Sequence, residues 1–91
     1  MSLAIVVPTL NEGKLIAATL TRLATLRARG AEIIVVDGGS SDETCAIAAP
    51  LADHVISAAR GRASQMNAGA AMARHEDKYT IIFHILDIFI Y

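Results

Sequence analysis

Short runs of aliphatic and β-branched residues alternate along this chain with longer stretches in which apolar residues recur every three or four positions. The run Ile-Ile-Val-Val has no polar alternation, which is typical of a strand buried on both faces of a sheet. Strands are predicted at residues 3–7, 33–36 and 54–56, and helices at residues 12–30, 42–49 and 61–74. Because strands that alternate with helices pair in parallel through right-handed crossovers, the pattern indicates an α/β fold.

Proline and serine residues mark the expected ends of these elements. Pro8 is expected to end the first strand, because proline cannot donate a hydrogen bond to a central ladder. Ser40, with Glu43 three residues later, is expected to cap the second helix after a turn that begins with two glycines. Pro50 is expected to terminate that helix.

The last run, residues 79–91, is β-prone throughout and is predicted to form a fourth strand. Strands usually have about 5–6 residues, so part of this run is expected to project beyond the sheet or to pack on another molecule. An apolar β-prone segment without gatekeeping charges is also prone to pair with other chains. We therefore predict a homo-oligomer that forms through this C-terminal strand.

The composition favours one small domain with an aliphatic core. The chain has 91 residues, of which 54% are hydrophobic and only 4% aromatic, so small aliphatic side chains must fill the interior. We expect a three-layer, Rossmann-like parallel sheet of about four strands with helices on both faces. Residues 1–91 would form this single domain, and residues 76–91 would be its atypical apolar tail.

The charge balance and the lack of long apolar runs limit the partners. Eight basic and nine acidic residues give a net charge of −1, which argues against a nucleic-acid partner or an anionic membrane surface. No run is long enough for a transmembrane segment, and the N-terminal residues do not resemble a signal peptide. A single cysteine, Cys45, fits a reducing compartment. We expect a cytoplasmic protein, with the inner face of the membrane as an alternative location.

Polar residues follow each of the first three predicted strands. Because the carboxyl ends of parallel strands share one edge of a sheet, these residues should lie close together. Carboxylates can accept from a base N–H or a ribose hydroxyl, and arginines and backbone N–H groups can bind phosphate, so the edge suits a nucleotide. Neither the phosphate-loop pattern nor the dinucleotide fingerprint occurs. The residues are Thr9, Asn11 and Glu12, then Asp37, and then Arg60, Gly61 and Arg62.

Three blocks, VVPTLNE at residues 6–12, VVDGGSSD at 35–42 and GRASQMNAG at 61–69, resemble the opening of a family 2 glycosyltransferase with the GT-A fold. The resemblance covers residues 3–73. It implies the N-terminal half of a GT-A domain, which binds a nucleoside-diphosphate sugar, and transfer of the sugar to an unknown acceptor. It also implies a divalent metal, Mn²⁺ or Mg²⁺, on the diphosphate. The nucleotide-binding residues it implies are Pro8, Thr9, Asn11, Glu12, Asp37, Gly38, Arg62 and Asn67.

Within that resemblance, the block at residues 6–12 would line the nucleoside pocket and Asp37 would contact the base. The block at residues 61–67 would flank the ribose and diphosphate. The family has an Asp-x-Asp-like or His-Ala-Asp motif after the next strand, where this chain has HILD at residues 84–87. Asp87 corresponds to the final metal-binding aspartate, but Ile85 takes the place of the first and cannot bind a hard cation.

The catalytic residues are left unknown, because the acceptor half of the family lies beyond Tyr91. We interpret the chain as the truncated or frame-shifted product of a longer gene, which alone is not expected to catalyse transfer. An uninterrupted native frame closing at Tyr91 would contradict this interpretation. The donor sugar, the acceptor and the stereochemical outcome stay open. The alternative function is a catalytically inactive nucleotide-binding or self-assembling module.

Each candidate residue also has a structural interpretation. Asp37 could brace the glycine-rich turn instead of contacting a base, and Glu12 could compensate the dipole of the following helix. Ser40 and Asp42 are interpreted as helix-start residues. Other polar residues have solvated or packed alternatives: Arg60 and Arg62 as loop cations, Asn67 on a helix face, and His54 and His84 as satisfied strand histidines.

Overall fold

A parallel sheet forms the middle layer of the computed structural model, which describes residues 2–75, 78–83 and 85. Within those residues the sheet has four strands in the order β3-β2-β1-β4. They are β1 (Leu3–Thr9), β2 (Glu32–Asp37), β3 (His54–Ser57) and β4 (Tyr79–Ile82). The expected α/β fold with a parallel sheet is confirmed.

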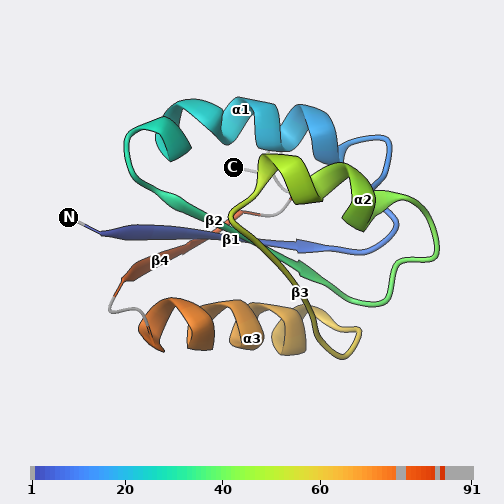
Figure 1. The fold of residues 1–91 in the computed structure, drawn as a ribbon. Helices are drawn as coiled ribbons and strands as arrows, with labels where there is room; N and C mark the ends of the chain where they lie inside the picture. Colours follow the sequence, from blue (N-terminus) through green and yellow to red (C-terminus); the bar gives the residue numbers. More distant parts are fainter. Residues whose placement is uncertain (1, 76–77, 84, 86–91) are drawn as a thin grey trace.

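The helices cover both faces of the sheet. In Figure 1, α1 (Ile16–Ala28) and α2 (Thr44–Ala48) lie on one face and α3 (Arg62–His75) lies on the other. The chain adds β2 and β3 on one side of β1, and then α3 leads back across the sheet to β4 on the other side. Such a change of direction is a topological switch point, and in open α/β sheets the carboxyl ends of the strands at that point bind ligands. None of the helices in the described part of the chain has the length and apolarity that a bilayer span requires.

The Ile-Ile-Val-Val run is apolar throughout because β2 contributes to two cores. Ile33 and Val35 pack in the core under α1 and α2, whereas Ile34 and Val36 pack in the core above α3. All four are at most 1% exposed. β1 alternates in the same way, so both central strands are buried on both faces, as the pattern predicts.

Helix α3 packs closely against the sheet at Gly69. A Cβ atom built on Gly69 would lie 2.3 Å from Cγ1 of Val6 and 3.1 Å from Cγ2 of Val36. Both distances are shorter than ordinary carbon contacts of about 3.5–4.0 Å. The absence of a side chain at residue 69 therefore allows α3 to lie where it does.

Several element ends differ from the prediction. Pro8 does not end β1, which continues to Thr9 with Pro8 opposite Val36. Alternate residues of a strand direct their backbone groups to opposite neighbours, and the carbonyl of Val6 accepts from Phe83 on the β4 side. The nitrogen of Pro8 therefore faces the side where β4 stops pairing after Val6, so proline interrupts no ladder there.

The helix boundaries differ for similar local reasons. α1 begins at Ile16 instead of Glu12, and a turn precedes it in which the amides of Leu15 and Ile16 both donate to the Glu12 carbonyl. Pro50 does not terminate α2 directly. It lies in a 3₁₀ turn, Ala49–Leu51, near whose start a missing N–H is tolerated.

The predicted fourth strand is confirmed only over Tyr79–Ile82. Ile85 lies in a turn, is 6% exposed and joins the core under α1 and α2, so the strand prediction is wrong at this residue. His84 and residues 86–91 of the predicted strand lie outside the described residues.

Candidate functional site

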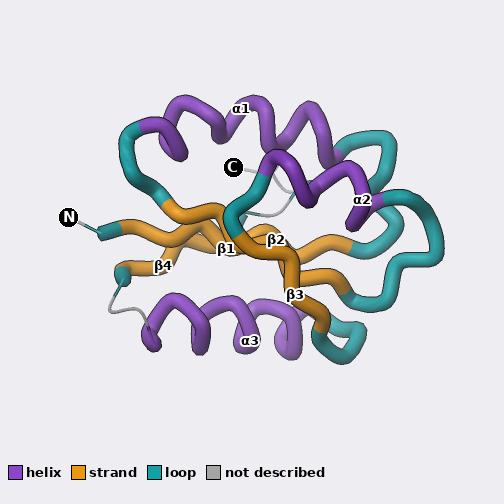
Figure 2. Tube along the Cα trace, in the orientation of Figure 1, coloured by secondary structure: helices purple, strands orange, loops and turns teal. Residues whose placement is uncertain are grey.

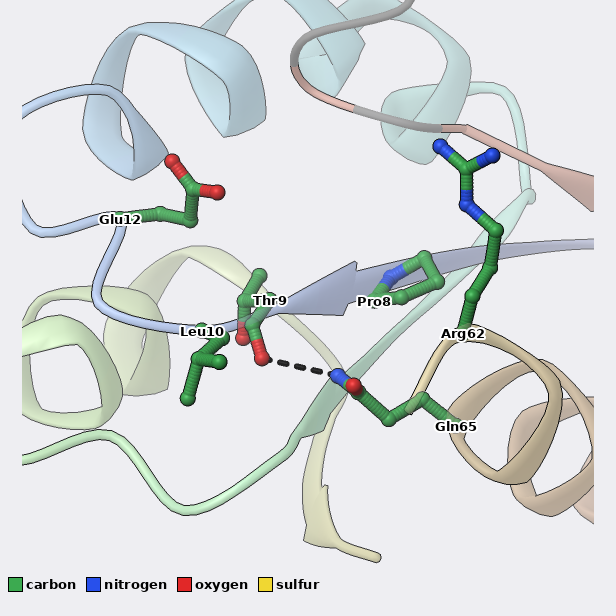
Figure 3. A pocket seen from close by; sticks show the side chains of 6 residues that line it. All are labelled: Pro8, Thr9, Leu10, Glu12, Arg62 and Gln65. Carbon is green, nitrogen blue, oxygen red and sulfur yellow. Dashed lines mark hydrogen bonds between the residues drawn. The ribbon is translucent and has the colours of Figure 1, made fainter. Parts of the chain in front are cut away.

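The loops that follow β1, β2 and β3 lie at one end of the sheet, at the right of Figure 2. Two hollows open there, with volumes of about 160 and 490 Å³. Glu12 contributes to both of them. The smaller hollow, drawn in Figure 3, is lined by Pro8, Thr9, Leu10, Glu12, Arg62 and Gln65. The larger hollow is lined by Asn11, Glu12, Lys14, Leu15 and Asp42.

Asp37 ends β2 beneath this site, and its carboxylate holds the following turn. One oxygen, Oδ2, accepts from the amides of Gly39 at 3.0 Å and Ser40 at 2.7 Å. The other, Oδ1, accepts from the hydroxyls of Thr9 at 3.3 Å and of Ser40. Gly39 has a φ of +99°, which glycine adopts without strain. The structure thus shows the turn-bracing role of Asp37, and both oxygens are engaged within the protein.

The environment of Asp37 favours its charged form. Burial alone would raise the pKa of this carboxyl, which is only 4% exposed. The hydroxyl and amide of Ser40, the amide of Gly39 and the hydroxyl of Thr9 together outweigh burial and lower the pKa below its ordinary value of 3.8. Asp37 is therefore ionised at neutral pH.

Ser40 is not the cap of α2, and the prediction that it starts the helix is wrong. α2 begins at Thr44 with Glu43 at its N-cap position, where no side chain caps the helix. Asp42 lies one residue before that position, and its Oδ1 accepts from the amide of Thr44 at 3.0 Å. The hydroxyl of Ser40 instead donates to Asp37 and accepts from the amide of Asn11 at 2.8 Å. A local capping rule fails here because tertiary partners use the same hydroxyl.

Further hydrogen bonds join the loop after β1 to the loop after β2. Oδ1 of Asn11, a residue with a φ of +52°, accepts from the amide of Ser41 at 2.8 Å. The amide of Glu12 donates to the Thr44 hydroxyl at 2.9 Å. The two loops therefore form one hydrogen-bonded unit at the edge of the sheet.

Glu12 responds to this environment differently from Asp37. Burial and, second, the negative charge of Asp42 raise the pKa of Glu12 above its ordinary value of 4.5. Asp42 itself has a lowered pKa because it accepts from the hydroxyl and amide of Thr44. The site thus contains carboxyls with opposite pKa shifts, and Glu12 is the one most readily protonated or paired with a donor.

Gln65 is a central residue of the site that the sequence analysis missed. It is 5% exposed, and its Nε2 donates to the carbonyl of Thr9 at 2.8 Å and that of Val36 at 2.9 Å. Figure 3 shows the first of these bonds. The available indication was its place in the block at residues 61–69, three positions after Arg62 and so on the same side of the helix.

The structure brings together most of the residues that the sequence singled out. Arg62 rises from the start of α3 beside Pro8 (Figure 3). Gly38 packs under Gln65, since an added Cβ would lie 2.8 Å from Oε1 of Gln65. Asn67 is exposed between the buried Gln65 and Gly69, so it faces away from the sheet and lines neither hollow.

The expected metal site is not found in the described part of the chain. Residues 2–75, 78–83 and 85 contain no group of three or more His, Cys, Asp or Glu side chains that could hold a metal ion. Asp87 and His84 lie outside the described residues. His54 contacts Glu32, with 3.1 Å between Nε2 and Oε2, which agrees with its interpretation as a satisfied strand histidine. Asp87 as a metal ligand therefore stays a prediction.

Comparisons with known proteins agree with this architecture. The model of the family described as "Glycosyl transferase family 2" matches residues 4–87. Glucosyl-3-phosphoglycerate synthase from Mycobacterium tuberculosis, in complex with Mn²⁺, uridine diphosphate and glucosyl-3-phosphoglycerate, superposes with a TM-score of 0.76 at 21% identity. That match covers 92% of this chain and 33% of the synthase. At this identity the likeness shows the fold.

Two further structures match a smaller part of the chain. The same synthase in complex with phosphoglyceric acid is 32% identical with a TM-score of 0.56, over 62% of this chain and 20% of that one. Mannosyl-3-phosphoglycerate synthase from Rubrobacter xylanophilus is 27% identical with a TM-score of 0.55, over 63% of this chain and 19% of that one. This chain thus spans between about a fifth and a third of these synthases. The search of curated proteins found no match.

Proposed function

Because the chain belongs to glycosyl transferase family 2, we propose that the two hollows at the switch point bind a nucleoside-diphosphate sugar. The observation that carries this proposal is the convergence of two distant parts of the sequence on one hollow: Pro8 and Glu12 at the end of β1 and in the loop after it, and Arg62 at the start of α3. Small-molecule sites have volumes of about 300–1,000 Å³, and the two hollows that share Glu12 provide room of that order.

Each side chain has a chemical task in this proposal. The carboxylate of Glu12 accepts from a ribose or base donor, and the Arg62 guanidinium pairs with a phosphate oxygen. Pro8 supplies an apolar wall for the nucleoside. Asp37 contributes through the turn that it shapes, because both of its oxygens already accept hydrogen bonds. A direct contact of Asp37 or Asn67 with the nucleotide stays a prediction.

The parent activity that we propose is transfer of the sugar from this donor to an acceptor. The Mycobacterium tuberculosis synthase was crystallised with Mn²⁺ and uridine diphosphate, and on that basis we choose uridine diphosphate as the first nucleotide to test. Developing charge on the departing diphosphate would require cationic groups, and Arg62, which lines the smaller hollow, is the candidate that we test. The described residues contain no group of three or more His, Cys, Asp or Glu side chains that could hold a metal ion, and we assign no catalytic step to them.

Calorimetric titration of the chain with uridine diphosphate or guanosine diphosphate, with and without Mn²⁺, is expected to give saturable heat for at least one nucleotide. The variant Arg62→Ala should weaken that affinity by about tenfold, because a charge-assisted hydrogen bond to phosphate is lost. Arg74→Ala removes the same charge from the exposed far end of α3 and is the matched control. The absence of heat at millimolar nucleotide would contradict the proposed function and favour an inactive module.

We also propose that copies of the chain associate through β4, an edge strand of the described sheet. Tyr79 and Ile81 are 72% and 51% exposed on this strand, and apolar edge strands pair readily with other chains. Sedimentation at high protein concentration should therefore show dimers or larger species, and Ile81→Lys should return monomers. Leu26→Lys, at an exposed leucine of α1, should leave the association unchanged. Monomers alone at every concentration would contradict this proposal.

A further inference from the structure

We propose that Gln65 is the positioning residue of this site and that it holds three loops in the arrangement a nucleotide requires. The inference rests on the nucleotide site proposed above and assigns to Gln65 no contact with the ligand. Its basis is a set of three hydrogen bonds of one side chain, which donates to the carbonyls of the distant residues Thr9 and Val36 and accepts from the amide of Gly61.

The amide of Gln65 links the ends of β1 and β2 to the loop before α3. Nε2 donates to the carbonyls of Thr9 and Val36, which are 56 and 29 residues away in the sequence. Oε1 accepts from the amide of Gly61 at 3.3 Å. The Thr9 carbonyl also accepts from the Gly38 amide at 3.0 Å, so the same oxygen connects the turn after Asp37. The ends of β1 and β2 and the loop before α3 are thereby connected to one side chain.

The orientation of this amide is fixed by its partners. Rotation of the amide by half a turn would place Oε1 against two carbonyl oxygens, which is repulsive. Close packing on Gly38 adds to this restraint, because the position of an added Cβ on Gly38 would lie 2.8 Å from Oε1. At 5% exposure, water cannot readily replace these bonds. The absence of a side chain at Gly38 therefore leaves the space that the Gln65 amide occupies.

The consequence for the ligand passes through Arg62. Arg62 precedes Gln65 by three residues, so both lie on the same side of the first turns of α3. When the Gln65 amide fixes the start of α3 against Thr9, it also fixes where the Arg62 side chain leaves the helix beside Pro8 (Figure 3). A site whose groups are held in place binds more tightly than one that must be ordered on binding.

The test uses Gln65→Met, which keeps the length of the side chain and removes its donors and acceptor. Affinity for uridine diphosphate is expected to fall by about tenfold or more in this variant. Ile34→Val, which removes a methyl group from the core above α3, is the control for loss of stability. Its affinity should stay within about twofold of the wild type at temperatures where both are folded. Equal affinity in Gln65→Met and the wild type would overturn the inference.

Gln65→Glu gives a signature that a packing role would not produce. A carboxylate at this position faces two carbonyl oxygens, and burial raises the pKa of such a carboxyl. Once protonated, the carboxyl can again donate to one carbonyl. The affinity of Gln65→Glu relative to the wild type is therefore expected to recover as the pH falls from about 8 to about 6. The affinity of Gln65→Met relative to the wild type should not change with pH. If the relative affinity of Gln65→Glu were also independent of pH, that result would contradict the inference.

Nuclear magnetic resonance separates failure of this inference from failure of the proposed function. If the wild-type chain binds no nucleotide, the proposed function is wrong, but the positions of the loops can still be measured. In Gln65→Met, the amide of Gly61 should exchange with solvent about tenfold faster, and the Gly38 resonance should shift. Unchanged exchange and shifts at both glycines would overturn the positioning role whether or not a nucleotide binds.

Discussion

Replacement of Gly69 by alanine is expected to lower the free energy of unfolding by about 2 kcal/mol, although alanine is the better helix former. The new methyl group would lie 2.3 Å from Cγ1 of Val6, so α3 must move away from the sheet or Val6 must change its rotamer. Overpacking of a core costs about 1–3 kcal/mol, and a contact as short as 2.3 Å places Gly69→Ala at the upper end of that range. The gain in helix propensity offsets about 1 kcal/mol of this cost. Gly69→Val should prevent folding, because a domain of this size has little stability to lose.

Urea denaturation of Gly69→Ala, Val6→Ala and the double variant tests this explanation. Val6→Ala removes the two methyl groups nearest to the added Cβ and costs stability of its own by opening a cavity. If the clash is the cause, the loss of unfolding free energy in the double variant should be smaller, by about 1 kcal/mol or more, than the sum of the losses in the two single variants. Ala71→Gly, at an exposed position of α3, measures the propensity difference alone. A Gly69→Ala protein that is about 1 kcal/mol more stable than the wild type would show that α3 moves without cost, because only the gain in helix propensity would remain.

The elements could be predicted from the sequence because the causes of their formation are local. Apolar β-branched runs predicted the central strands, and apolar residues spaced three or four positions apart predicted the helices, and the structure has both. The ends of these elements depend on distant partners instead. Ser40 donates to Asp37 and accepts from Asn11, and Pro8 is tolerated because β4 stops pairing beside it. Neither relation is visible in a short stretch of sequence.

The candidate site divides in the same way. Its place at the carboxyl ends of β1, β2 and β3 follows from parallel pairing, which the alternation of elements predicts. The importance of Gln65 could not be predicted, because it depends on carbonyl groups of β1 and β2 that only the fold brings near α3. Gly69 is a similar case. Glycine within a helix looks unfavourable until the position of Val6 is known.

Replacement of Asp37 by asparagine is expected to lower the free energy of unfolding by about 2 kcal/mol near neutral pH, because hydrogen bonds to a charged acceptor become neutral or are lost. Both backbone amides of the turn, those of Gly39 and Ser40, donate to Oδ2, and they cannot turn to other partners without moving the turn. The side-chain oxygen of asparagine can accept from both amides only if its NH₂ group faces the hydroxyls of Thr9 and Ser40. Asp37→Ala offers no acceptor at all and should cost about 3 kcal/mol or more.

The pH dependence identifies the charge of Asp37 as the cause. The folded protein lowers the pKa of this carboxyl, so the unfolded chain binds the proton more tightly. The stabilisation is complete above the unfolded pKa of about 3.9 and is lost as the pH falls through the lower pKa of the folded protein. The stability difference between wild type and Asp37→Asn should thus stay constant from about pH 7 to pH 5 and narrow below about pH 4. Glu43→Gln removes an exposed charge from the same loop and is the control. A difference that stays constant into strong acid would mean that packing, and not the carboxylate, stabilises the turn.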